Sequence, residues 1–291
     1  MVSFALKFEG RNADEHTLDL YDAAQAMLGF QRSLAITTHL VLNGQVITQA
    51  PSLKNAEILT FPAEEGSWKI VATIVGGLFA LGTVPKDTPI GHLMHSAYDY
   101  VVSESLGFHV DYNSTLGEQY DRLKKDEQSA LPILEQSRFD SVIEKCEAAI
   151  KEMHRPIIYS ETATDGKISF QSGPNIEPLR SQFSRDTFEY LRYTVKDKNP
   201  VNVEGRVSSY NINTYKGRIY VKEEGRPIPF ILKEGALFPS NINKITQSLS
   251  LNAADRFERN GFIVCEAHRI ESRTGRLKSY EIINVALPIP E

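Results

Sequence analysis

The chain has 291 residues, of which 41% are hydrophobic and 24% are charged, and its formal net charge is −5. This composition excludes a disordered or low-complexity chain. Two cysteines without a CxxC pair exclude a disulfide framework and a cysteine-rich zinc module. At about 100 to 200 residues per domain, the length predicts more than one domain.

The first elements are predicted to be a strand, a long helix and a hairpin. Residues 2–9, VSFALKFE, alternate in the way of a strand. A helix is expected from Asp19 to Leu42, where apolar residues recur every three or four positions and Asn43-Gly44 follows as a stop signal. Two apolar stretches on either side of the acidic turn Ala63 to Ser67 predict the hairpin. This order of elements indicates an α+β domain.

The longest apolar run extends from Ile70 to Val84, 15 residues without a charge. A membrane-spanning helix needs about 20, so we expect no constitutive transmembrane span. The run is predicted to be a strand that enters a turn. An amphipathic helix follows from Pro89 to Leu106, capped by Thr88 and closed by Gly107 in a left-handed conformation. We expect this helix to pack on the core, with triggered membrane exposure of residues 70–106 as the alternative.

The pattern between Asp111 and Met153 predicts helix, with an interruption near Ala130 to Pro132. Its last helix is predicted to be capped by Ser137 and to carry Cys146 on its apolar side. After Pro156 the pattern changes. The stretches IIYSE and KISF flank Asp165-Gly166, which is typical of a hairpin, and a loop with Gly173, Pro174 and Pro178 follows.

The last part of the chain predicts five short strands with one helical insert. The strands are expected at residues 202–212, 216–224, 226–232, 262–272 and 276–287, and the helix at 241–259. Five strands within about 95 residues are typical of a small barrel of the OB or SH3-like type. The predicted fold class is therefore α+β, with an N-terminal mixed helix/strand domain and a C-terminal small β-barrel-like domain. The expected divisions are residues 1–155, a hairpin and connecting segment at 156–195, and the barrel at 196–291.

The two parts of the chain differ in charge. Residues 196–291 hold 15 Lys and Arg against 11 Asp and Glu, a net charge of +4, so residues 1–195 have a net charge of −9. Cations and aromatic residues alternate in the C-terminal part, and cations neutralise phosphates while rings stack on bases. The candidate residues for binding nucleic acid or another anion are Arg206, Tyr210, Tyr215, Lys216, Arg218, Tyr220, Arg226, Arg269, Arg273, Arg276 and Lys278. The alternative is an ordinary solvated surface, because exposed strands favour the same residue types.

Two sets of residues are weak candidates for a metal site. They are His92, His95 and Asp99 on one side of a helix, and Asp255, Glu266 and His268 in the C-terminal part. Imidazole and carboxylate suit zinc or iron in the first set, and carboxylates suit Mg²⁺ in the second. The first set is equally explained as the polar side of an amphipathic helix, and the second as polar positions of a half-exposed strand. We expect no cofactor.

The usual nucleotide-binding, serine-hydrolase and zinc-protease motifs are absent from the sequence. The start MVSFALKFEG lacks the pattern of a secretory signal, which predicts a cytoplasmic protein. We expect a non-enzymatic binding or assembly protein whose barrel binds an anionic partner, nucleic acid or nucleotide, and which forms a homo-oligomer or binds a partner protein. The alternatives are a toxin-like effector of a bacterial antiviral (phage-defence) system that exposes residues 70–106 to a membrane, and a metal-dependent hydrolase or nuclease.

Overall fold

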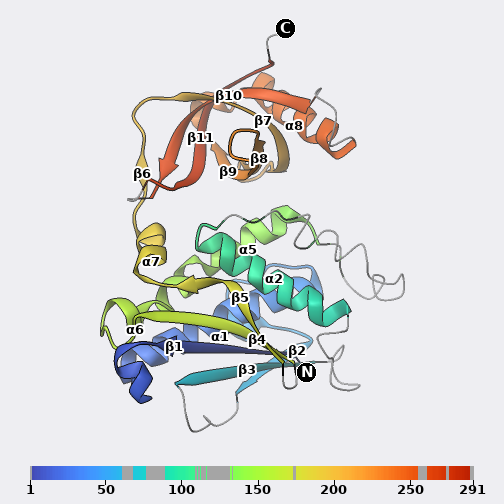
Figure 1. The fold of residues 1–291 in the computed structure, drawn as a ribbon. Helices are drawn as coiled ribbons and strands as arrows, with labels where there is room; N and C mark the ends of the chain where they lie inside the picture. Colours follow the sequence, from blue (N-terminus) through green and yellow to red (C-terminus); the bar gives the residue numbers. More distant parts are fainter. Residues whose placement is uncertain are drawn as a thin grey trace. The chain divides into compact units, whose positions relative to one another are not determined.

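In a computed structural model the chain forms two compact units, Met1–Arg192 and Tyr193–Glu291 (Figure 1). Each unit has its own hydrophobic core. The structure describes residues 2–60, 68–76, 89–108, 110, 112, 116, 132, 134–172, 175–254, 261–272 and 275–288. Among the predicted features, the turn at 63–67, the end of the apolar run at 77–84 and the cap Thr88 lie outside these residues.

The first unit is built on a five-stranded antiparallel sheet in the order β2-β3-β1-β4-β5. The strands are β1 (Val2–Glu9), β2 (Ala56–Thr60), β3 (Lys69–Gly76), β4 (Asp165–Ser172) and β5 (Asn175–Phe183). The helices are η1 (Arg11–Glu15), α1 (Leu20–Asn43), η2 (Ala50–Ser52), α2 (Pro89–Ser105), α5 (Gln136–Glu152), α6 (Arg155–Ile158) and α7 (Arg185–Arg192). Figure 1 shows α1, α2 and α5 on the same side of the sheet.

β1 and α1 follow their sequence patterns closely. Alternate residues of β1 are buried against the helices: Val2, Phe4, Leu6 and Phe8. The ring of Phe4 meets Tyr98 and Phe170 edge-on, at 5.0 and 5.3 Å between centroids. α1 begins after Asp19, whose side chain accepts a hydrogen bond from the backbone N–H of Asp22, and ends at Gly44 with a φ of +66°. Local signals therefore determine both elements.

α2 is a core helix in the part of it that the structure describes. Seven of its apolar side chains are fully buried: Leu93, Met94, Ala97, Tyr98, Tyr100, Val101 and Val102. Gly107 has a φ of +78°, and the backbone N–H of Phe108 donates to the carbonyl of Ser103, which confirms the predicted left-handed end. Across the described ranges, the chain contains no helix that is both long enough and apolar enough to cross a membrane.

The segment from 156 to 195 differs from its prediction. Residues 155–158 form the short helix α6, because Pro156 is well suited to the first turn of a helix, so IIYSE is not a strand. Asp165-Gly166 begins β4, which pairs with β1 and β5. Pro178 lies in β5, an edge strand of the sheet, where a missing N–H is tolerated. The segment up to Arg192 thus belongs to the first unit.

α5 also differs from its prediction at its start. The helix begins at Gln136 with Glu135 at the N-cap position and no side-chain cap, so Ser137 is not the cap. Its apolar side is as predicted, with Phe139, Val142 and Cys146 buried. The hydrophobic period is set by the core, whereas the first residue of the helix depends on the preceding chain.

The second unit is a closed five-stranded barrel, which confirms the predicted fold class. The barrel strands are β7 (Val201–Asn211), β8 (Lys216–Val221), β9 (Arg226–Leu232), β10 (Phe262–Glu271) and β11 (Leu277–Ala286). The unit also contains the short strand β6 (Val195–Lys196), which pairs with β10, and the helices η4 (Glu234–Ala236) and α8 (Pro239–Ala254). β7, β8 and β9 form an antiparallel meander, β9 pairs in parallel with β11, and β10 joins β11 to β7. With a helix between the third and fourth strands, this connectivity is of the OB type.

Candidate nucleic-acid interface

A row of four residues crosses the outer surface of the barrel. Phe262 of β10 pairs with Arg206 of β7, Arg206 pairs with Tyr220 of β8, and Tyr220 pairs with Pro227 of β9. We call these four residues the outer row. Arg206 and Tyr220 lie between buried strand neighbours, such as Val207 with 0% exposure, and Ile263 after Phe262 is buried too, so alternation directs these three side chains outward. Pro227 is buried at the end of the row.

The outer row holds a cation between two aromatic rings. The guanidinium carbon of Arg206 lies 5.0 Å from the ring centroid of Phe262 and 5.6 Å from that of Tyr220. All three side chains are half-buried, so each retains surface that a ligand can reach. Cation–π contacts of this kind stabilise by about 0.5–1 kcal/mol at exposed sites. The contacts fix the guanidinium in place without removing its charge.

Two more predicted cations share the outer side of β8. Lys216, Arg218 and Tyr220 alternate with residues that point into the barrel, and Arg218 pairs with Pro229 of β9. Lys216 is exposed, whereas Arg218 is only 3% exposed. A β-bulge between Val207 and Ser209 shifts the register of β7 against β8 here. The accessible outer surface of these strands thus combines Arg206 and Lys216 with Tyr220, whereas Arg218 is buried.

Other predicted residues have different roles. Nη2 of Arg226 and Nη1 of Arg269 each lie 3.6 Å from a carboxylate oxygen of Glu224, and Nε of Arg269 lies 2.7 Å from Oε1 of Glu271. The hydrogen bond that Arg269 donates to Glu271 raises the pKa of Arg269, although burial opposes this shift. Acidic neighbours therefore compensate both arginines, and a phosphate would have to compete with them.

The remaining candidates that the structure describes pack or form hydrogen bonds within the second unit. The ring of Tyr210 stacks on Phe230 at 6.3 Å, and Tyr215 packs against the barrel core. Nζ of Lys278 donates to Oγ1 of Thr194 at 3.0 Å. The backbone N–H of Arg276 donates to Ser272, and Arg273 lies outside the described residues. Burial raises the pKa of Tyr210, as is expected for a ring held in packing.

Phe262 is the residue of this surface that sequence reasoning missed. It is the first residue of β10, and the stretch FIVCEA alternates so that Ile263 and Cys265 are buried in the barrel. That alternation places Phe262 on the opposite side, which is a signal the sequence contains. Its proximity to Arg206 depends on the pairing of β10 with β7, two strands that are far apart in the chain.

The side chains of the first metal set do not converge. His92 is exposed, and the ring of His95 lies edge-on to Phe170 at 5.2 Å. Asp99 is buried, accepts from the backbone N–H of Arg180 at 2.9 Å, and lies 3.4 Å from Nε of the same residue. Burial raises the pKa of Asp99. The three side chains share one helix but have different neighbours.

The structure describes the second metal set only in part. Asp255 lies outside the described residues, and a bulge separates Glu266 from the residues that follow it in β10. Nδ1 of His268 donates to the carbonyl of Asp197 at 2.9 Å. Within the ranges that the structure covers, no group of three or more His, Cys, Asp and Glu side chains could hold a metal ion.

Both cysteines are structural. Cys146 lies in the first core and Cys265 in the barrel core, with exposures of 0% and 1%. Burial raises the pKa of each thiol to about 12. Because the thiolate is the reactive form, neither cysteine is prepared for nucleophilic chemistry.

Comparison with known proteins gives two family matches, both without an assigned function. A family model described as a domain of unknown function (DUF7946) matches residues 4–192, and one described as a family of unknown function (DUF7947) matches residues 199–286. The two matched ranges correspond to the two structural units. No curated protein and no solved structure matches the chain.

Proposed function

We propose, for a chain that belongs to the family described as a domain of unknown function (DUF7946) over residues 4–192, that the second unit binds single-stranded nucleic acid. The family has no assigned function, so the proposal is argued from the barrel. The observation that carries the proposal is the outer row, in which Arg206 lies between the rings of Phe262 and Tyr220. Ring faces stack on bases of any sequence, and a guanidinium donates hydrogen bonds to phosphate oxygens.

The barrel connectivity supports this assignment. OB-type barrels bind oligonucleotides on the surface of their second and third strands, between the first and last hairpin loops. In this chain the second and third strands are β8 and β9, which carry Tyr220 and Pro227 of the outer row. Lys216, which is exposed, extends the same surface along β8.

A single strand fits this surface better than a duplex does. The faces of bases in a duplex are covered by their stacked neighbours, so an aromatic ring reaches them only in unpaired nucleic acid. The net charge of +4 in residues 196–291 is modest. Cations that contact phosphates release counterions, so we expect binding that weakens as salt is raised.

The test is fluorescence anisotropy of the full-length protein with a labelled oligonucleotide of about 20 nucleotides, which exceeds the span of about 4–16 nucleotides for one OB barrel. Tyr220→Ala should raise Kd by about 5- to 100-fold through the loss of one stacked base, and Tyr220→Phe should bind as the unaltered protein does. Arg206→Gln should reduce the slope of log K against log salt by about 0.7, the value for one phosphate contact on a single strand.

Lys151→Gln is the matched control, because it removes one positive charge from α5 in the first unit. Its Kd and salt slope should equal those of the unaltered protein. The proposal fails if the full-length protein has no salt-dependent affinity for single-stranded DNA or RNA. It also fails if Tyr220→Ala, shown to be folded by circular dichroism, binds as well as Tyr220→Phe.

A further inference from the structure

α1 exposes a stripe of large apolar side chains on the side that faces away from the core. The stripe consists of Leu20, Tyr21, Met27 and Leu28, with exposures of 84%, 62%, 38% and 60%. At 100° per residue, these positions lie within one broad arc of the helix. The stripe spans about two turns of α1, with the half-buried Ala24 between its two ends, and an exposed apolar patch of this kind marks an interaction surface.

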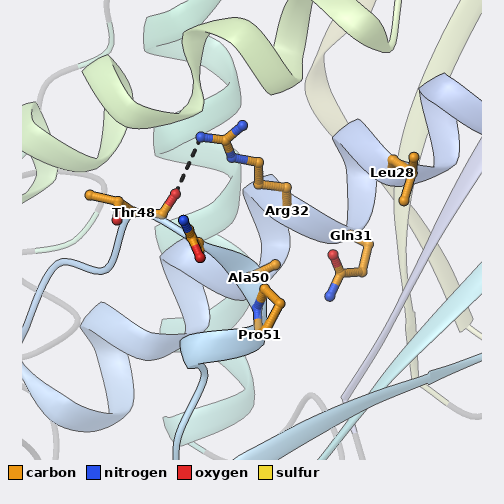
Figure 2. Close-up of a pocket in the computed structure, with 7 residues that line it drawn as sticks. Leu28, Gln31, Arg32, Thr48, Ala50 and Pro51 are labelled. Atoms are coloured by element: carbon orange, nitrogen blue, oxygen red, sulfur yellow. Dashed lines mark hydrogen bonds between the residues drawn. The ribbon is translucent and has the colours of Figure 1, made fainter.

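A pocket adjoins the C-terminal end of the stripe (Figure 2). Its volume is about 580 Å³, and it is lined by Leu28, Gln31, Arg32, Thr48, Gln49, Ala50 and Pro51. Nη2 of Arg32 donates to the carbonyl of Thr48 at 3.2 Å, which ties the segment before η2 to α1. Leu28 belongs to both the stripe and the pocket. The stripe therefore leads from a protruding Leu20 to a partly apolar hollow on the same helix.

We propose that this surface joins two copies of the chain, with α1 of one copy antiparallel to α1 of the other about a two-fold axis. Gln31 and Arg32 of the pocket follow Leu20 by 11 and 12 positions, about 17 Å along the helix at 1.5 Å per residue. When two such helices cross near residue 26, Leu20 of each copy lies opposite the pocket of the other. A two-fold axis makes this contact twice, as a self-complementary interface requires.

The charges at the two ends of the stripe favour the same arrangement. Asp19 and Glu15 are exposed at the N-terminal end, and Arg32 is exposed at the C-terminal end. Among the described residues, no carboxylate lies within ion-pair distance of Arg32. Antiparallel packing brings Arg32 of each copy to the acidic end of the other, and both contacts form together. The half-buried Ala24 lies near the crossing point, where a small side chain allows close approach.

A disulfide between copies tests the register directly. Within one chain, positions 20 and 31 are about 16 Å apart along the helix, whereas the Cα atoms of a disulfide lie within about 7 Å. The double variant L20C/Q31C can therefore cross-link only between chains. The native cysteines Cys146 and Cys265 are buried, so they do not compete for the cross-link. Under mild oxidation we expect a covalent dimer on a non-reducing gel. L20C/I176C is the control, because Ile176 is 59% exposed but lies on β5, and it should remain a monomer on the gel.

The oligomeric state in solution gives a second readout. Light scattering or sedimentation should give twice the chain mass for the unaltered protein. Leu20→Lys places a second cation opposite Arg32 of the other copy, so it should shift the protein to a monomer with unchanged circular dichroism. Ile176→Lys should remain dimeric. The proposal is overturned by a monomeric unaltered protein, by a dimer that Leu20→Lys leaves intact, or by cross-linking of the control pair that equals that of L20C/Q31C.

Discussion

Arg155 and Asp22, far apart in the chain, form a nearly enclosed ion pair in the first unit. Nε of Arg155 lies 2.8 Å from Oδ1 of Asp22, and Oδ2 of Asp22 accepts from the backbone N–H of Ser160 at 2.9 Å. The guanidinium carbon lies 5.0 Å from the ring of Tyr21 and 4.5 Å from the ring of Tyr159. This pair fastens the first turn of α1 to α6 and the loop after it.

Arg155→Met should destabilise the first unit by about 3 kcal/mol, because it leaves the Asp22 carboxylate buried without its cation. Urea unfolding followed by the fluorescence of Trp68, the one tryptophan of the chain, reports on this unit. Adding Asp22→Asn should recover part of the loss. Lys151→Gln, which breaks an exposed pair with Glu147, should change the unfolding free energy by less than about 1 kcal/mol. Equal effects of the two single variants would refute the prediction.

His154 should make the first unit less stable in mild acid. The side chain is fully buried, its Nδ1 donates to the carbonyl of Ile150, and its Nε2 lies 3.0 Å from Oγ1 of Thr187. Burial lowers the pKa of His154 from 6.5 to about 4. Above pH 6.5 the ring is neutral in both states, so its ionisation does not change the unfolding free energy.

Between pH 6.5 and about pH 4 the unfolded chain binds a proton at His154 that the folded chain does not bind. The unfolding free energy should therefore fall by about 3 kcal/mol over this window, at about 1.4 kcal/mol per pH unit, and this contribution should be constant below it. Urea unfolding at a series of pH values measures the effect. In His154→Gln the fall should be smaller by that amount, and identical pH profiles for both proteins would contradict the assignment.

Gly107→Ala should destabilise the first unit by more than about 2 kcal/mol. The φ of +78° alone costs a residue with a Cβ about 1–2 kcal/mol. A Cβ at this position would also lie 2.3 Å from Cζ of Tyr190. Because Tyr190→Ala removes the ring, the double variant G107A/Y190A should lose less stability than the sum of the two single variants, as measured by urea unfolding. Strict additivity would mean that the ring contact is unimportant.

Local patterns in the sequence predicted many of the elements closely. The alternation of β1, the start of α1 near Asp19 and its stop signal at Asn43-Gly44, and the strands of the barrel appear where expected, because strand period and helix ends depend on residues a few positions apart. The prediction of a strand at 157–161 was wrong for the same reason. Its β-forming composition is a local signal, but the partner of β4 is β1, which lies at the other end of the first unit.

For the candidate interface, the sequence by itself determined the α+β class, the small barrel, the charge difference between the two parts and the residue types of the outer surface. Only the tertiary structure decided which of these residues act together. The pairing of β10 with β7 brings Phe262 to Arg206, and the β8–β9 turn brings Glu224 to Arg269. Periodicity is a property of neighbouring residues, whereas strand register and ion pairing depend on residues that only the folded chain brings into contact.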